Sequence, residues 1–411
     1  MITHFSENYR PLYFLSALGM GGLSISFFMY LMFLVPHPNT PIPTFDSLTA
    51  QFAKGNVTAN VLMVVTLLAI AYFAVRHVQL LIANIAAYRR FTRTPDYTAL
   101  ISSNAEVQLM AVPLTLSMTV SVLFVLGALT VPGLWDVKEW LFPFALAVNS
   151  AIGAYAFMLF GRYINRILSD GSFNVDDTNH FSQVLPSFAF AMIGVGFSSS
   201  AAMSQTLVTS LIGAAGTALF LAAAALWGFV KMPVSFGAML RHGMAREAGP
   251  TLWLAIPILT LFGIAGIRVS SGLAHNVLHS DIPGIVWLVF FGAIVALQLI
   301  VGLFGWAVMR RQGYFSQFVS GPGRSIPAYG LICPGVALIV LSQFFIGRGL
   351  VGSGVLEKFS VTHMVLLALV FFLQLLTIRT VARLNAKLLG VPKPSAEASA
   401  DEENTEAVSL R

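Results

Sequence analysis

Ten apolar segments constrain the fold of this chain more than any other feature of its sequence. Each is about 20 residues or longer, the length that an α-helix needs to cross roughly 30 Å of hydrocarbon. Only 10% of the 411 residues are charged, against roughly 25% in a soluble domain. The sequence therefore predicts an all-α integral membrane protein with ten transmembrane helices. The predicted spans are about residues 11–35, 60–84, 106–131, 140–165, 184–205, 209–230, 249–268, 285–309, 325–346 and 361–383.

A proline recurs near the start of every odd-numbered segment. The five are Pro11, Pro113, Pro186, Pro257 and Pro334, at intervals of 102, 73, 71 and 77 residues. Such spacing is what duplication of a helical hairpin leaves in a sequence. A proline in a membrane helix frees a backbone carbonyl, which is tolerated where neighbours or a water-filled cavity satisfy it. We therefore expect five pseudo-repeated hairpins, with Pro-kinked odd helices forming an inner ring around water and even helices forming an outer ring.

The distribution of Lys and Arg predicts the orientation of these helices. Of the 23 Lys and Arg residues, 16 fall on the side that holds both termini and 5 on the opposite side, with Arg76 inside a span and Arg411 at the C-terminus. Cytoplasmic loops carry the excess of basic residues in membrane proteins. We expect a cytoplasmic N-terminus (1–10), a ten-helix transmembrane domain (11–390) and a cytoplasmic tail (391–411), which its Pro, Ser, Ala and Glu content predicts to be disordered.

Aromatic residues stand at one fixed distance from the prolines. Phe124, Phe197 and Phe345 each lie eleven residues after a proline, and Arg268 holds that position after Pro257. Eleven residues are about three helical turns, so the four could form one layer about 16 Å beyond the prolines. A hydrophobic constriction can gate a pore by dewetting, but abundant phenylalanines also pack helices or face lipid. Both interpretations of these positions remain open.

The polar residues of the predicted spans favour an anion or a neutral solute. Hydroxyl groups on the odd segments, including Ser117 and Ser199, are neutral donors suited to a partly dehydrated anion, although such small residues also serve helix packing. No acidic side chain lies within the core of a predicted span, whereas proton and cation carriers usually need one there. Arg76 and Arg268 are the candidate anion contacts, and Arg76 alternatively snorkels to the membrane surface. The positive charges follow the loops and indicate no nucleic-acid partner.

Cys333, the only cysteine of the chain, directly precedes Pro334. A single cysteine in a membrane span usually packs as a small apolar residue. At a helix break beside a cavity it could instead be a reactive thiol. This leaves a membrane thiol or redox protein, with Cys333 as its chemical centre, as the alternative to a transport protein. His275, His279 and Asp281 lie close in sequence but lack an evident further ligand, so we predict no metal and no cofactor.

Ten spans with both ends inside, repeated hairpins and proline-bearing odd helices resemble the tellurite-resistance/dicarboxylate transporter family, which includes the plant slow anion channels. The resemblance covers about residues 10–390. It implies a homotrimer in the plasma membrane (in bacteria, the inner membrane), in which each protomer has its own central anion pore. It also implies that a phenylalanine of the ninth helix closes the pore, here Phe345 or Phe344.

The chain is also similar to a bacterial branch with this architecture, the TsoY-like membrane proteins, some of which are thought to carry selenocysteine. This similarity implies that Cys333 occupies the selenocysteine position and has a sulfur- or selenium-related role. The leading prediction is a channel or secondary carrier that passes a small anion or anionic metabolite through a central pore in each protomer.

Overall fold

A computed structural model describes residue 5 and residues 9–389. These residues form helices and no strands, and ten of the helices are long and apolar enough to cross a membrane. The prediction of an all-α protein with ten membrane-length apolar helices is therefore confirmed. The predicted disordered tail, residues 391–411, lies outside the described residues, as does most of segment 1–10. The ten spans are Pro11–Leu34, Val57–Phe91, Asn104–Thr130, Leu134–Ser169, Phe181–Met203, Leu207–His242, Arg246–Leu278, Gly284–Arg311, Ile326–Val351 and Val361–Leu388.

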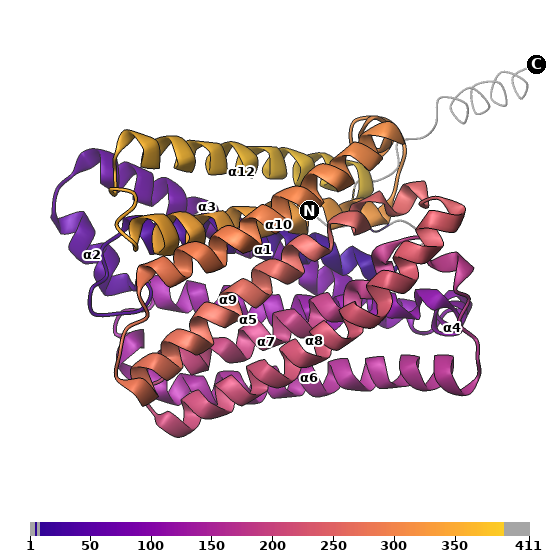
Figure 1. The fold of residues 1–411 in the computed structure, drawn as a ribbon, viewed down its shortest axis with the longest axis horizontal. Helices are drawn as coiled ribbons and strands as arrows, with labels where there is room; N and C mark the ends of the chain where they lie inside the picture. Colours follow the sequence, from indigo (N-terminus) through magenta and orange to yellow (C-terminus); the bar gives the residue numbers. More distant parts are fainter. Residues whose placement is uncertain (1–4, 6–8, 390–411) are drawn as a thin grey trace, which may run out of the picture.

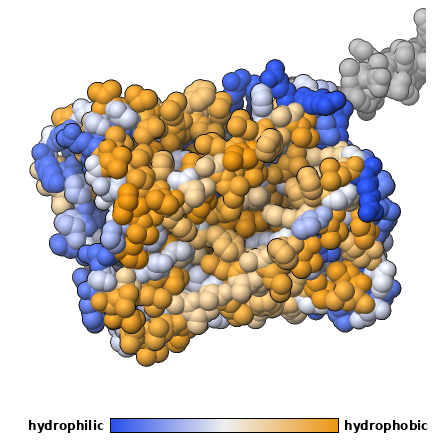
Figure 2. Space-filling view, viewed as in Figure 1, coloured by the Kyte–Doolittle hydropathy of each residue, from blue (hydrophilic) through white to orange (hydrophobic). Residues whose placement is uncertain are grey.

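The long helices lie side by side, and the segments that connect them gather at the two ends of the bundle (Figure 1). The short helix α2 (Phe45–Ala53) marks one end and α4 (Pro95–Ile101) marks the other. Apolar side chains cover the surface between the ends, and polar side chains gather at the ends themselves (Figure 2). A protein that spans a lipid bilayer has apolar side chains where it faces hydrocarbon and polar side chains at the two membrane surfaces. The observed distribution therefore supports an integral membrane protein.

Each odd-numbered span begins with a 3₁₀ segment and continues as an α-helix. The prolines mark this change of helix type: Pro11 is the first residue of its 3₁₀ segment, and the other four are the second or third residues of their α-helices. A proline in the first turn displaces no intrahelical hydrogen bond, because the amides of that turn have no partner within the helix. The prolines thus stand at the entry of the α-helices, and the predicted kinks stay a prediction. The pairs are η1 (Pro11–Tyr13) with α1 (Phe14–Leu34), η2 (Asn104–Met110) with α5 (Ala111–Thr130), η5 (Phe181–Val184) with α7 (Leu185–Met203), η6 (Arg246–Trp253) with α9 (Ala255–Leu273) and η9 (Ile326–Leu331) with α11 (Ile332–Phe344).

The even-numbered spans are mostly uninterrupted α-helices. They extend beyond the predicted spans, as α8 shows by continuing to His242, twelve residues past the predicted end at 230. Short turns complete the described chain: the 3₁₀ turns η3 (Leu134–Val137) and η4 (Asp176–Thr178), and the π-helical turns η7 (Ala274–Leu278), η8 (Phe315–Val319) and η10 (Phe345–Val351). The even helices are α3 (Val57–Phe91), α6 (Lys138–Ser169), α8 (Leu207–His242), α10 (Gly284–Arg311) and α12 (Val361–Leu388).

Burial separates the two sets of spans. The most apolar stretches of the five odd spans are 72%, 56%, 94%, 50% and 72% buried within the protein, whereas those of the even spans are 22%, 33%, 33%, 17% and 22% buried. The odd spans therefore form the interior of the bundle, and the even spans supply most of its apolar surface. Descent of the five helix pairs from one repeated hairpin stays a prediction.

Candidate functional site

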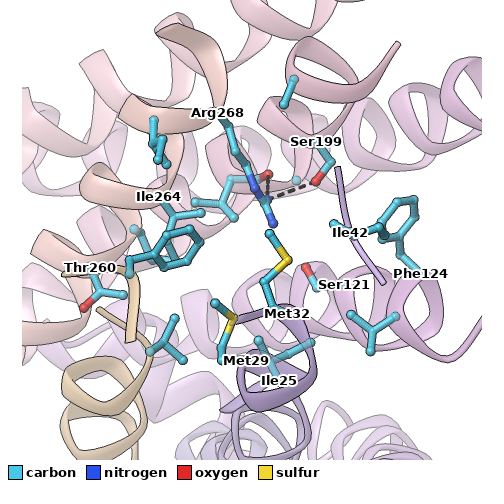
Figure 3. Close-up of a pocket in the computed structure, with 18 of the residues that line it drawn as sticks. Ile25, Met29, Met32, Ile42, Ser121, Phe124, Ser199, Thr260, Ile264 and Arg268 are labelled. Carbon is cyan, nitrogen blue, oxygen red and sulfur yellow. Dashed lines mark hydrogen bonds between the residues drawn. The ribbon is translucent and has the colours of Figure 1, made fainter. Parts of the chain in front are cut away.

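A cavity of about 630 Å³ lies among the odd-numbered spans. All five of them contribute to its wall, through residues such as Met29 of α1, Phe124 of α5, Ser199 of α7, Thr260 of α9 and Val340 of α11. Figure 3 shows several of these side chains converging on one space. Ligand sites in proteins commonly have volumes of about 300–1,000 Å³, so the cavity is large enough for a metabolite.

The cavity reaches toward the α2 end of the bundle. Its wall runs from Pro257 and Cys333, near the starts of α9 and α11, to Ile42 and Asp281 in the connections at the α2 end. Beyond its other limit, side chains at the 3₁₀ entries are almost completely buried: Tyr13, Phe14, Val184 and Tyr329 are at most 1% exposed. This packed layer separates the cavity from the α4 end.

Arg268 is the charged residue that stands inside the cavity rather than at its α2 end. The α9 backbone carries it about 16 Å beyond Pro257, eleven residues along the helix. Its Nη1 donates hydrogen bonds to the Ser199 hydroxyl (3.0 Å) and to the Val195 carbonyl (3.3 Å), both on α7. Figure 3 shows the guanidinium group pointing into the space between Ser199 and Met32. Its Nε and Nη2 groups make no hydrogen bond to another described residue and remain as donors for a ligand.

No carboxylate among the described residues forms an ion pair with Arg268. The other charged residues of the wall, Asp281 and Arg348, stand at the α2 end, together with His275. The remaining wall consists mainly of aliphatic, methionine and phenylalanine side chains with a few hydroxyl groups. A cation in such surroundings is costly unless a negative charge accompanies it, so the site is complementary to an anion.

The structure divides the four predicted gate residues into two pairs. Phe344 and Phe124 line the cavity, and the Phe344 ring packs against the rings of Phe33 and Phe291, at centroid distances of 5.4 and 5.6 Å. Phe197 and Phe345 are absent from the wall. The four therefore do not form one aromatic layer around the cavity.

The two excluded rings pack against outer helices. Phe197 stacks on Phe220 of α8 at 5.4 Å and covers Gly216. Phe345 contacts Gly292 of α10. Of the two ninth-span residues named by the family resemblance, Phe344 therefore lines the cavity and Phe345 does not.

The other predicted site residues also separate. Ser199 lines the cavity, whereas Ser117 is fully buried outside the cavity wall and donates to the Met192 carbonyl at 3.2 Å, a contact between α5 and α7. Of the five prolines, Pro257 lines the cavity and the other four do not.

Arg76 lies outside the wall, on α3, and its Nη1 donates to Gln79 at 2.8 Å. Of the two candidate anion contacts, Arg268 lies in the cavity wall and Arg76 does not.

Cys333 lines the deep part of the cavity and is 7% exposed. The nearest wall residues along α11 are Val336 and Ala337, which are apolar. A chemical role for this thiol stays a prediction.

The sequence did not indicate Arg348 and Asp281 as cavity residues. Arg348 follows Phe344 by one helical turn. Residues one turn apart lie on the same face of a helix, so this spacing could have indicated that Arg348 lies near the cavity. Asp281 belongs to the loop between η7 and α10. Nothing in the sequence of this loop indicates that it lines the cavity.

No protein-family model matches this chain, and no curated protein matches it. The resemblance to the tellurite-resistance/dicarboxylate transporter family therefore continues to rest on architecture.

Proposed function

We propose that this protein is a transport protein, a channel or a secondary carrier, that passes a small anion or anionic metabolite through its central cavity. The observation that carries the proposal is Arg268, a guanidinium group that has no carboxylate partner among the described residues and lies inside a cavity bounded by all five interior spans. Hydrogen bonds from Arg268 and from hydroxyl groups such as Ser199 replace part of the hydration shell of an anion. Because only one positive charge lies beside the bound anion, binding need not be too tight for release.

The route follows from the position of the packed layer. An anion enters from the α2 end, passes Arg348 and binds at Arg268. To leave at the α4 end it requires separation of the buried side chains around Tyr13 and Tyr329. The test is anion flux into proteoliposomes that contain the purified full chain, compared with protein-free liposomes. Absence of flux for every anion tested would count against the proposal.

The rest of the assignment is part of the same proposal: a homotrimer in the plasma membrane with both termini in the cytoplasm. The excess of basic residues on the terminus-bearing side supports this orientation. Mass measurement of the protein in native lipid tests the trimer, and protease access to the C-terminus in inside-out vesicles tests the orientation.

Replacing Phe344 with alanine should raise anion flux severalfold. The ring is in the cavity wall, where it packs against Phe33 and Phe291, and its removal enlarges the cavity on the route from the α2 end to Arg268. Flux assays with proteoliposomes measure the effect. Phe345→Ala is the matched control, because Phe345 packs against α10 outside the wall. An equal rise in both variants would mean that general loosening of the protein, rather than a gate, causes it.

Replacing Arg348 with glutamine should lower flux a few-fold at low ionic strength. Arg348 is exposed at the cavity entrance, where its charge balances that of Asp281, so its removal leaves a net negative charge that lowers the local concentration of anions. The difference from the unsubstituted protein should shrink as salt is added, because the Debye length falls to about 8 Å at 0.15 M. Flux measured across a salt series checks this, and a deficit that persists at high salt would contradict the steering role.

A further inference from the structure

We infer that the transported anion carries a single charge on an apolar body, as an aryl- or alkyl-substituted monocarboxylate does. The inference rests on the proposed transport function and narrows its substrate class. A bare halide fits the described site less well because it is too small to fill the cavity. A small dicarboxylate fits less well because it carries a second negative charge.

The charge argument begins with the fixed charges of the wall. Arg268 is the cation inside the cavity, and its described partners, the Ser199 hydroxyl and the Val195 carbonyl, are neutral. The entrance holds Arg348 and Asp281, whose formal charges cancel. A monoanion at Arg268 is fully compensated, whereas the second charge of a dianion would lie uncompensated in apolar surroundings.

The size argument begins with the walls around Arg268. The space of about 630 Å³ is far larger than one inorganic ion. The side chains that surround it include Ile25, Met29, Met32, Ile264 and Phe124 (Figure 3). Methionine side chains adapt to irregular apolar shapes, and apolar surfaces favour contact with apolar groups over contact with water. A hydrocarbon group attached to the anionic head would fill this space.

The orientation of such a ligand follows from the two ends of the cavity. The hydroxyl groups of Ser199 and Ser121 lie on the α7 and α5 side of Arg268. The deep part toward Cys333, Val336 and Ala337 is apolar. The carboxylate would therefore bind Nε or Nη2 of Arg268, and the apolar body would extend toward Cys333.

Equilibrium binding to the full chain in lipid nanodiscs tests the inference with four probes. Phenylacetate has both a charge and an apolar body, acetate has the head alone, phenylacetamide has the body without the charge, and succinate has two charges. Radiolabelled probes are measured by equilibrium dialysis, with protein-free nanodiscs to subtract partition into lipid. Phenylacetate should bind at least tenfold more tightly than each of the other three. In Arg268→Gln its affinity should fall to that of phenylacetamide, while Arg76→Gln should keep the full affinity.

A second measurement locates the ligand. Because Cys333 is the only cysteine, the rate of N-ethylmaleimide labelling reports on the cavity alone. Bound phenylacetate should slow labelling, and acetate at the same concentration should not.

The outcomes separate this inference from the proposed function. If acetate or succinate binds as tightly as phenylacetate, and Arg268→Gln weakens that binding, the substrate class is wrong and the anion-transport proposal stands. If phenylacetamide binds as tightly as phenylacetate, the site does not select anions and both are wrong. If no probe binds and no anion crosses the membrane, both are likewise rejected.

Discussion

Replacing Arg268 with glutamine should reduce anion flux and anion affinity by about tenfold to a hundredfold. A hydrogen bond to a charged group contributes about 1.5–3 kcal/mol, and each 1.4 kcal/mol corresponds to about a factor of ten in binding. Glutamine keeps a polar side chain but removes the positive charge, so the head group loses its counter-charge inside the cavity. Proteoliposome flux and equilibrium binding both measure the effect.

Two further variants distinguish a ligand contact from general damage to the protein. Arg76→Gln removes the same charge from α3, outside the cavity wall, and should leave flux unchanged. Arg268→Lys keeps the charge but cannot present the planar donor pair of a guanidinium group, so it should fall between the unsubstituted protein and Arg268→Gln. If Arg76→Gln lowers flux as strongly as Arg268→Gln does, the assigned position of the anion is wrong.

The ten helices could be predicted from the sequence because their apolar segments must satisfy the thickness of a membrane. The helix ends could not be placed as well. Hydropathy marks the part of a helix that lies in hydrocarbon, whereas α8 continues through Arg241 and His242 as a regular helix beyond it. Four of the five prolines lie within the first three residues of an odd α-helix, but the 3₁₀ segments that precede these helices have no comparable signal.

The face that each side chain presents could not be predicted. A helix that is apolar on all sides has no hydrophobic stripe to orient it, so the shared spacing from a proline did not tell Phe124 from Phe197. Phe345 is a second case, because it directly follows Phe344 and is turned from it by about 100° around the helix axis, toward α10. Arg268 and Arg76 are both basic residues in apolar segments, and only the packing of neighbouring helices places one inside the cavity.

Replacing Gly272 with alanine should strongly destabilise the protein and weaken the site at the same time. A Cβ atom at Gly272 of α9 would overlap the carbonyl oxygen of Ala201 on α7 and lie 2.7 Å from its carbonyl carbon. The obstacle is backbone, so the two helices must move apart. Overpacking of this kind costs about 1–3 kcal/mol and occasionally more. Thermal unfolding of the purified protein should show a lower midpoint.

The same displacement should reach Arg268. Gly272 lies one turn after Arg268 on α9, and Ala201 lies two residues after Ser199 on α7, so the glycine contact holds the two helices at the separation that the 3.0 Å Arg268–Ser199 hydrogen bond requires. Gly161→Ala on α6 is the control, because apart from the adjoining backbone of α6 itself no described atom lies within 4 Å of its added Cβ. Alanine is favoured over glycine in a helix by about 0.5–1 kcal/mol, so this variant should be equally or more stable and keep full anion affinity. A Gly272→Ala protein with unchanged stability and unchanged affinity would mean that α7 and α9 do not approach as closely in the membrane, and the geometry assigned to the anion site would then be wrong.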